Sequence, residues 1–337
     1  MFLMVRGPAA WPRPPVQGAE VPDGLLRPHA AAAATPERRD GPVAAIVVAY
    51  ESSAVLARCL ETLRDAAPGR GVDIRVVDSA STDGSAALAD SLLGASRVIR
   101  LSSNRGFAAG VNAGLAGVDA PWIAVVNPDV RVPRGGLDRL VDVLERHPRA
   151  GLAGPRVVGA GGRPERSVGL FPTLSREWAH SWLLDHLGWP GRWARLPGTV
   201  TSVDWVSGCV WLLRAEAARA VGPLDEGYFM YCEDVDYCRR LHDAGWNVLA
   251  VPEVEWVHDV GTGSRKTGLV AADGGPALLR YFAKFHPGVP EQRVRALLLR
   301  GWRLRRAWRE ARVRLGDAGS AEMARRYQIA IKTLSRP

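Results

Sequence analysis

The stretch VAAIVVA, Val43 to Ala49, is a continuous apolar run of strand length. A strand that is apolar at every position is typical of a sheet covered on both faces, because a half-exposed strand alternates apolar and polar residues. The polar pair Tyr50-Glu51 follows directly. The run therefore predicts a fully buried strand with polar residues at its carboxyl end.

A strand-then-helix rhythm continues from this run to about residue 150. The predicted strands are 43–49, 74–78, 98–101 and 122–126, and the predicted helices are 55–63, 86–93, 106–117 and 137–145. Strands and helices that alternate with short links favour parallel strands joined by crossover helices. The sequence therefore predicts an α/β protein with a Rossmann-like, mostly parallel sheet flanked by helices.

Beyond about residue 150 the rhythm changes. Residues 159–200 are rich in Gly, Pro, Arg and Trp, and predict loops with one short helix near 176–187. Residues 203–213 predict a pair of strands broken at Ser207-Gly208, and residues 234–244 predict a helix that ends at Gly245. Two further strands are predicted at 246–251 and 254–257, the second followed by His258.

Composition narrows the class of protein and its location. The chain has 337 residues, an ordinary apolar fraction of 47% and a formal net charge of +9. This charge favours an anionic partner: nucleic acid, a phosphorylated small molecule or an acidic membrane surface. Residues 1–40 are rich in Pro, Ala and Arg and predict a disordered extension. Since neither a signal-peptide core nor a run of 18 apolar residues is present, a cytoplasmic protein is expected.

Residues 291–315 combine apolar residues at helical spacing with many arginines. The apolar positions are Val294, Leu297, Leu298, Leu304, Trp308 and Leu315, and the basic ones are Arg293, Arg295, Arg300, Arg303, Arg306, Arg309, Arg312 and Arg314. Such a helix suits an anionic membrane surface, and it equally suits a terminal helix that packs on the domain with a solvated arginine face. Because the arginines concentrate in one helix and no recognised nucleic-acid motif is present, nucleic-acid binding is disfavoured.

Polar residues follow the ends of the predicted parallel strands. They are Ala49-Tyr50-Glu51, Asp78, Asn104-Arg105 and Asn127-Pro128-Asp129. Ligands of open parallel sheets bind at the carboxyl ends of the strands. We therefore expect a cofactor or nucleotide at this edge.

Two of these strand ends carry a specific chemistry. Asp78 can accept a hydrogen bond from a ribose hydroxyl or a base N–H; the alternative role, a helix cap, is already suited to Asp83. Asn127 and Asp129 offer one amide and one carboxylate for a Mg²⁺ or Mn²⁺ ion that also binds phosphates. His258 is either a further ligand, which would favour manganese, or a structural histidine.

Small residues recur every fourth position at Gly106, Gly110 and Gly114. The spacing is not the G-x-G-x-x-G fingerprint of dinucleotide-binding enzymes, which disfavours a dehydrogenase. Arg105 and Asn112 are then candidates for contacts with a diphosphate and a sugar. Tight packing of this helix on the sheet is the other explanation for the glycines.

The segment YFMYCEDVDYC, residues 228–238, carries three carboxylates at the start of a predicted helix. Glu233, Asp234 and Asp236 at that position stabilise the helix through its dipole. An ionised carboxylate held in a cleft beside aromatic residues can also act as a general base. The segment alone supports both roles.

Seven segments, in this order, resemble the family 2 glycosyltransferases with a GT-A fold. They are IVVAY, VVDSASTDGS, NRGFAAGVNAGL, VVNPDV, VSGCVWLLR, VGPLDEGYFMYCEDVDYCRRLHDAGW and VPEVEWVHD. The resemblance covers about residues 42–265, and NRGF, NPD and the segment around EDVD resemble the rhamnosyltransferase-type branch. It implies inverting, metal-dependent transfer of a sugar from a nucleotide sugar.

The resemblance also implies a role for individual residues. Asp78 would contact the base beside Ala49, Tyr50 and Glu51; Arg105, Asn112 and Asn127 would complete the nucleotide-sugar site; Asp129 and His258 would hold the metal; Asp234 would be the general base; and Glu233, Asp236, Trp205, Ser207 and Gly208 would shape the acceptor site. The chain departs from the family where Asn-Pro-Asp offers one carboxylate instead of two. It also departs at Ser79, where asparagine is common.

These observations divide the chain into residues 1–40, a GT-A domain at 41–265 with nucleotide-sugar (41–150) and acceptor (151–265) parts, and a helical basic region at 266–337. The expected donor is dTDP-L-rhamnose, and the expected acceptor is a polyprenyl-diphosphate-linked or other cell-envelope glycan. The protein is expected to associate peripherally with the inner face of the cell membrane through 291–315. The alternatives are a transferase that uses a UDP- or GDP-sugar, an inactive scaffold of the same fold, and a nucleic-acid-binding protein.

Overall fold

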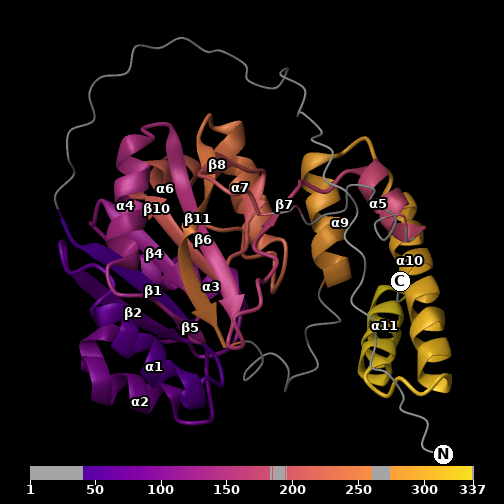
Figure 1. Cartoon of the computed structure of the whole chain (residues 1–337), viewed down its shortest axis with the longest axis horizontal. Coiled ribbons are helices and arrows are strands. Elements are labelled where there is room, and N and C mark those ends of the chain that lie inside the picture. Colours follow the sequence, from indigo (N-terminus) through magenta and orange to yellow (C-terminus); the bar gives the residue numbers. More distant parts are fainter. Residues whose placement is uncertain (1–40, 183, 185–193, 195, 260–273, 336–337) are drawn as a thin grey trace, which may run out of the picture. The chain divides into compact units, whose positions relative to one another are not determined.

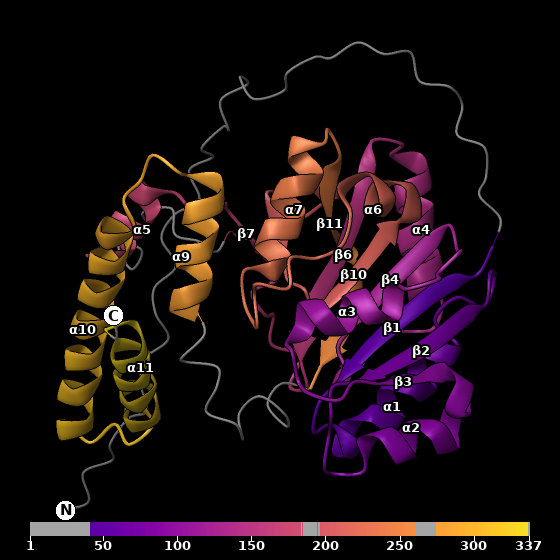
Figure 2. The same cartoon turned by 180° about the vertical axis from the view of Figure 1, so that it is seen from behind.

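The computed structural model describes residues 41–182, 184, 194, 196–259 and 274–335, so the predicted extension at 1–40 lies outside the described residues. The helices and strands follow one another along the chain, and Figures 1 and 2 label most of them. They are β1 (Val43–Ala49), α1 (Ser53–Arg64), β2 (Val72–Asp78), α2 (Ser85–Leu93), the 3₁₀ turn η1 (Ala95–Arg97), β3 (Val98–Arg100), α3 (Phe107–Leu115), β4 (Trp122–Val126), β5 (Val130–Arg131), α4 (Gly136–Arg146), β6 (Ala150–Gly159), β7 (Val168–Gly169), α5 (Leu174–Ser181), β8 (Thr201–Ser202), β9 (Trp205–Val206), β10 (Val210–Arg214), α6 (Ala215–Val221), α7 (Glu233–Asp243), β11 (Asn247–His258), α9 (Gly274–Phe285), α10 (Glu291–Arg314) and α11 (Ser320–Leu334).

The main sheet has the strand order β3-β2-β1-β4-β10-β6-β11-β5, and β8 pairs with β11. Strands β3, β2, β1 and β4 are parallel, which confirms the prediction from the alternating pattern. Strand β10 runs antiparallel to both β4 and β6, whereas β6 and β11 are parallel. The register pairs Ala49 with Asp78, so the first two strand ends meet at one edge.

Helices cover both faces of the sheet. Successive side chains of a strand point to opposite faces. Accordingly, Val43 and Val47 of β1 join a core with α1, α2 and α4, whereas Ile46 and Val48 join a core with α3, α6 and α7. Figure 2 shows α3 in front of β1 and β4. All seven residues of β1 are buried, as the apolar run predicts.

The glycines of α3 serve close packing on the sheet. A Cβ at Gly110 would lie 2.5 Å from Val48 Cγ1, and a Cβ at Gly114 would lie 2.3 Å from Ile46 Cγ2. Neither space admits a methyl group, since real Cβ contacts under 3.0 Å are essentially absent. The packing explanation for these two glycines is therefore confirmed.

The second half differs from its predicted elements. The strands predicted at 246–251 and 254–257 are one strand, β11, whose pairing with β6 shifts register between Val251 and Glu255. The strands predicted within 203–213 do not pair with each other: β9 pairs with β7 in a separate two-stranded sheet, and β10 enters the main sheet. Strand β6 was not predicted, because Gly151, Gly154 and Pro155 interrupt its apolar run.

Candidate active site

Asp78 lies at the end of β2 with one carboxylate oxygen available. Its side chain is buried, and its Oδ2 accepts the N–H of Ser81 at 3.0 Å. Its Oδ1 is buried without a hydrogen-bond partner among the described residues. Asp83 accepts the N–H groups of Ser85 and Ser53, which start α2 and α1. Asp83 thus caps both helices. Asp78 Oδ1, which has no partner among the described residues, is therefore available to accept a hydrogen bond from a ligand.

Hydrogen bonds also show that Asp83 is firmly ionised. Its partial burial acts to raise the pKa, but the hydrogen bonds from Ser85 and Ser53 outweigh burial and lower the pKa to about 2. Beside it, Glu51 has a left-handed backbone (φ 50°) and accepts the N–H of Thr82 at 2.7 Å. Glu51 therefore holds together the two loops that follow β1 and β2, next to the half-buried Tyr50.

Asp129, His258 and Glu165 form one cluster at the ends of β4 and β11. His258 Nε2 lies 3.2 Å from Asp129 Oδ1, and its Nδ1 lies 2.9 Å from Glu165 Oε2. Burial would lower the pKa of His258, but hydrogen bonding and the charge of Asp129 and Glu165 raise it to about 9. Pairing of β5 with β11 places His258 opposite Val130, directly after Asp129.

Sequence reasoning predicted Asp129 and His258 and missed Glu165. Glu165 lies in a Gly- and Arg-rich stretch without a recognisable motif. It reaches His258 only because the chain folds back after β6. A carboxylate on the second nitrogen of a histidine orients the ring toward whatever the first nitrogen binds.

The donor set at this cluster fits a divalent cation bound together with phosphates. Among the described residues, no group of three or more His, Cys, Asp and Glu side chains is arranged to hold a metal ion by itself. Asp129 Oδ1 is nevertheless buried, and among the described residues its contact with the His258 imidazole at 3.2 Å is an ion pair without the geometry of a full hydrogen bond. One carboxylate and one imidazole leave most coordination positions to phosphate oxygens and water, as Mg²⁺ and Mn²⁺ sites commonly do.

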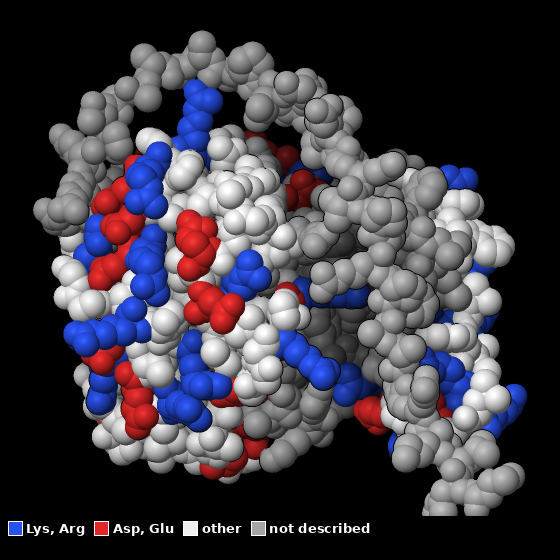
Figure 3. Space-filling view, viewed as in Figure 1, with Lys and Arg blue, Asp and Glu red and all other residues white. Residues whose placement is uncertain are grey.

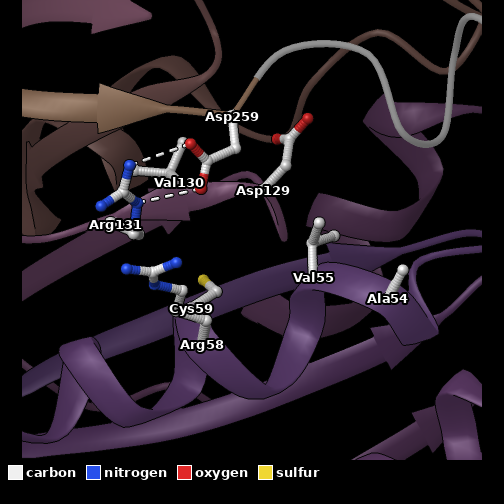
Figure 4. Close-up of a pocket in the computed structure, with 8 residues that line it drawn as sticks. All are labelled: Ala54, Val55, Arg58, Cys59, Asp129, Val130, Arg131 and Asp259. Atoms are coloured by element: carbon white, nitrogen blue, oxygen red, sulfur yellow. Dashed lines mark hydrogen bonds and ion pairs between the residues drawn. The ribbon is translucent and has the colours of Figure 1, made fainter. Parts of the chain in front are cut away.

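A hollow adjoins Asp129 on the α1 side of the sheet (Figure 4). Arg131 forms a two-bonded ion pair with Asp259 at 2.9 and 3.0 Å across its upper wall. Arg58 projects from α1 toward this pair, while Val55 lines the floor. The hollow thus extends from the Asp129 cluster and combines positive side chains with an apolar base.

The carboxylates of residues 233–236 begin helix α7 after a strained turn. Tyr231 and Cys232 both have left-handed backbones, with φ of 70° and 63°. Consecutive left-handed residues other than glycine are costly and cluster at functional sites. Asp234 is half-buried and accepts the N–H groups of Gly208 at 3.1 Å and Val235 at 2.8 Å. Burial raises the pKa of Asp234, although these backbone hydrogen bonds oppose the shift.

Its two acidic neighbours differ in their partners. Burial, followed by the charge of Asp234, raises the pKa of Glu233 to about 8, and Glu233 Oε2 has no hydrogen-bond partner among the described residues. Asp236 is completely buried, but it binds Arg240 at 2.7 Å and Lys284 of α9 at 2.6 Å. Asp236 is therefore held in a buried ion-pair network, and Lys284 is a partner that the sequence pattern did not indicate.

The loop between β9 and β10 links the two acidic clusters. Gly208 donates to Asp234 at 3.1 Å, and the next residue, Cys209, accepts the N–H of Asn127 at 2.9 Å. Ser207 donates its N–H to Ser167, close in sequence to Glu165. Asn127 is thereby held beside the Asp129 cluster while Asp234 is held against the same loop. The structure brings these predicted site residues together through backbone hydrogen bonds.

Trp205, Arg105 and Asn112 have contacts of their own. Trp205 is buried and donates its indole N–H to Leu170 O at 3.0 Å, which fixes the wall before Ser207. The exposed Arg105 pairs with Glu226. Asn112 exchanges hydrogen bonds of 2.9 Å with the backbone of Leu224.

The same helix start touches the acidic segment. Phe107 donates its N–H to Phe229 O, and a Cβ at Gly106 (φ 92°) would lie only 2.2 Å from that oxygen. The start of α3 therefore packs against the segment that carries the carboxylates, and only glycine fits there.

Comparisons with known proteins agree with this geometry. Residues 44–196 match the family described as Glycosyl transferase family 2. Over 232 residues the chain is 36% identical to the N-acetylglucosaminyl-diphospho-decaprenol L-rhamnosyltransferase of Mycobacterium tuberculosis (strain ATCC 25618 / H37Rv), which covers 63% of this chain and 74% of that relative.

The chain belongs to glycosyltransferase family 2. A second relative supports the rhamnosyltransferase-type branch for this family 2 glycosyltransferase: Rhamnosyltransferase WbbL of Escherichia coli (strain K12) is 45% identical over 58 residues, 17% of this chain and 22% of the relative. The expected family and enzyme class are thus confirmed.

Solved structures confirm the GT-A fold of this glycosyltransferase. GalNAc-T7 with UDP, GalNAc and Mn²⁺ matches with a TM-score of 0.52 at 14% identity, over 66% of this chain and 44% of that one. The Pyrobaculum calidifontis mannosyltransferase PcManGT with GDP-Man and Mn²⁺ matches with a TM-score of 0.50 at 15% identity, over 92% and 88%.

Proposed function

We propose that this glycosyltransferase moves L-rhamnose from dTDP-L-rhamnose to a hydroxyl of a polyprenyl-diphosphate-linked glycan, with inversion at the anomeric carbon. The rhamnosyl donor and the lipid-linked acceptor are supported by the named activity of the mycobacterial relative. A role in making the cell envelope and a position on the inner face of the membrane follow from an acceptor of that kind. The expected extent of the catalytic domain, residues 41–265, is part of the same proposal.

One observation carries the proposal. The loop at Gly208-Cys209 is hydrogen-bonded to Asp234 on one side and to Asn127 on the other. The same loop therefore positions both the candidate general base and the strand end that is the candidate binding site for the diphosphate. Transfer of a sugar from a nucleotide requires this pairing, since one group takes a proton while another meets the departing diphosphate.

In the proposed reaction, Asp234 accepts the proton of the acceptor hydroxyl as the hydroxyl oxygen attacks the anomeric carbon. The bond from that carbon to the diphosphate breaks, and the nucleoside diphosphate departs with the bonding electrons. A raised pKa makes Asp234 a stronger base than an ordinary carboxylate. Glu233 and Asp236, with Trp205 and Ser207, shape the acceptor side.

On the donor side, Asp78 receives the base beside Ala49, Tyr50 and Glu51. Its orphaned Oδ1 supports this role, because a buried unpaired oxygen is expected to find a donor in the bound ligand. Asn127, Arg105 and Asn112 lie around the diphosphate and the sugar. Arg105 and Asn112 also contact residues 224–226, so these two residues help to hold that loop in place.

Asp129 and His258 would hold a divalent cation, Mg²⁺ or Mn²⁺. When bound, the ion supplies positive charge for the departing diphosphate. Removal of the metal with EDTA should abolish transfer, and Mn²⁺ or Mg²⁺ should restore it. Undiminished transfer in EDTA would remove the metal from the proposal.

The donor is tested with purified protein and a panel of dTDP-, UDP- and GDP-sugars. Release of nucleoside diphosphate should be fastest with dTDP-L-rhamnose when a prenyl-diphosphate-linked acceptor is present. NMR of the product should give an anomeric configuration opposite to that of the donor. A faster rate with a UDP- or GDP-sugar would assign the protein to the alternative donor class.

A further inference from the structure

Helix α10 buries one side against neighbouring helices. Val294, Leu298, Gly301 and Arg305 are its buried residues. A Cβ at Gly301 would lie 3.0 Å from Ser181 Cα of α5, so the two helices are in close contact there. The guanidinium of Arg305 donates to the carbonyl of His180 at 2.7 Å. The packing alternative from the sequence is therefore correct for this side of the helix.

The opposite side carries arginines without carboxylate partners. Arg293, Arg300, Arg303 and Arg314 are exposed, and none has an acidic partner among the described residues. Their spacings of 7, 3 and 11 residues are close to whole helical turns, so they share one side. Other arginines of α10 are paired: Arg295 with Glu291, Arg306 with Glu310 and Arg312 with Asp317.

Large apolar side chains are exposed beside these arginines. Leu304, Trp308 and Leu315 of this region are 39%, 45% and 87% exposed. Trp178 of α5 and Trp182 just after it are 47% and 43% exposed, and their rings are in contact, with centroids 6.5 Å apart.

A cation–π contact joins the two helices on this side. The guanidinium of Arg300 lies 3.2 Å from the centroid of the Trp182 ring. Arginines and exposed tryptophans therefore form one continuous surface, which we call the Arg–Trp face: Trp178, Trp182, Arg293, Arg300, Arg303, Leu304, Trp308, Arg314 and Leu315. Figure 3 shows basic side chains interspersed with uncharged ones over α10.

We infer that the Arg–Trp face binds the surface of a bilayer that contains anionic lipids. Guanidinium groups bind lipid phosphates in pairs of hydrogen bonds, and tryptophan prefers the boundary between headgroups and acyl chains. Exposed leucines at the same level would enter that boundary, a contribution that a nucleic-acid backbone would not reward. Among the described helices, none combines the length and the apolar character that a membrane span needs.

The inference deepens the proposed function and rests on it for the source of the membrane, since a polyprenyl-linked acceptor lies in a bilayer. The proposed membrane-binding surface includes α5 as well as the predicted segment 291–315. Within α10, lipid contact is assigned to the arginines that have no carboxylate partner among the described residues. The paired arginines of the same helix are then structural.

The test measures binding of the full chain to vesicles in flotation assays without any nucleotide sugar or acceptor. Wild-type protein should float with phosphatidylglycerol vesicles and much less with phosphatidylcholine vesicles. The variant with Arg293→Gln, Arg300→Gln, Arg303→Gln and Arg314→Gln should bind phosphatidylglycerol vesicles more weakly by at least about a hundredfold. Each arginine near an anionic surface is expected to contribute roughly fivefold to the affinity. Trp178→Ser with Trp308→Ser should weaken binding by about tenfold.

A matched control removes the same charge elsewhere. Its substitutions are Arg134→Gln, Arg139→Gln, Arg146→Gln and Arg219→Gln, at exposed positions on or beside α4 and α6 that have no ion pair with another described residue. This control should retain vesicle binding, and thermal unfolding of both quadruple variants should match the wild type. Equal loss in both variants, or wild-type binding to duplex DNA but not to vesicles, would overturn the inference.

The proposed function fails separately. Asp234→Asn should lose transfer but keep wild-type vesicle binding. A protein that floats normally but transfers no sugar would leave the Arg–Trp face standing and remove the transferase proposal.

Discussion

Asp234 and Asp236 lie two residues apart in the first turn of α7, the first half-buried and the second fully buried, and their surroundings are opposite. Asp236 is held by Arg240 and Lys284. Among the described residues, Asp234 accepts hydrogen bonds from backbone N–H groups alone, and desolvation raises its pKa. A buried carboxylate between two cations depends on both partners, since removing either of them leaves a buried charge that is less well compensated. A buried carboxylate without a cation gains proton affinity, which is what a general base requires.

The cluster at His258 stands between these two cases. Its carboxylates share a single imidazole, and the Asp129 oxygen that faces this imidazole at 3.2 Å is buried. The three sites therefore differ in the partners of their carboxylates, and the roles proposed for them rest on that difference.

The largest expected effect is that of Asp234→Asn. Removing the base should lower kcat by about 10² to 10⁴, while the fold remains intact because asparagine keeps one acceptor for Gly208. Initial rates of nucleoside diphosphate release measure this. Asp243→Asn, at the exposed end of the same helix, is the matched control and should keep most activity. Near-normal turnover by folded Asp234→Asn would show that another group takes the proton.

Lys284→Met should destabilise the protein, because it removes one of the two cations that pair with Asp236. Loss of this partner leaves Asp236 buried with only Arg240, at a cost of about 3 kcal/mol in the free energy of unfolding. Arg280→Met is the matched control: its ion pair with Asp225 is at the surface and should contribute under about 1 kcal/mol. Urea unfolding measures both. Equal effects of the two substitutions would mean that Asp236 does not depend on Lys284.

Glu165→Gln should weaken the cluster at His258 without touching the base. Because Glu165 orients the imidazole, its loss should reduce Mn²⁺ affinity by about 10- to 100-fold. Calorimetric titration of Mn²⁺ in the presence of nucleoside diphosphate measures this without catalysis. Glu255→Gln, exposed on the same strand β11, is the control. Unchanged affinity in Glu165→Gln would leave the residue a structural role only.

Glu233→Gln should have the smallest effect, a change in the free energy of unfolding that depends on pH. The pKa of Glu233 is raised from an ordinary 4.5 to about 8, so the folded protein binds this proton more tightly than the unfolded chain. Its stabilising contribution is complete below pH 4.5 and is lost as pH rises through about 8. Glutamine imitates the neutral form.

The variant should therefore match the wild type near pH 4.5 and exceed it above pH 8 by roughly 1 to 3 kcal/mol. Thermal unfolding across this range gives the measurement. A constant difference between the two proteins at all pH values would mean that Glu233 does not titrate as the structure indicates.

The first half of the fold was accessible from sequence, and the second half only in part. Strand β1 is apolar throughout and α1 has one apolar face, so period and length sufficed. Strand β6 contains Gly151 and Gly154, whose Cβ atoms would lie under 3 Å from Ala217 and Val206. These glycines interrupt the local pattern because of neighbours that are distant in sequence.

The same division holds at the site. Asp78, Asp129 and Asp234 were predicted because they follow strands or start a helix within motifs. Glu165 and Lys284 were missed, since each reaches its partner from a segment without such a pattern. The strain at Tyr231 and Cys232 had no local signal either, because neither residue favours a left-handed backbone.

The sequence by itself determined the parallel half of the sheet, the edge where the polar residues gather and the family. These depend on periodicity and on short motifs, which are local properties of the chain. Only the tertiary structure decided which carboxylates are paired and which sides of α10 are buried. Those outcomes depend on partners from α9, α5 and the stretch around Glu165, and the proton affinity of a buried group is set by the neighbours that folding brings to it.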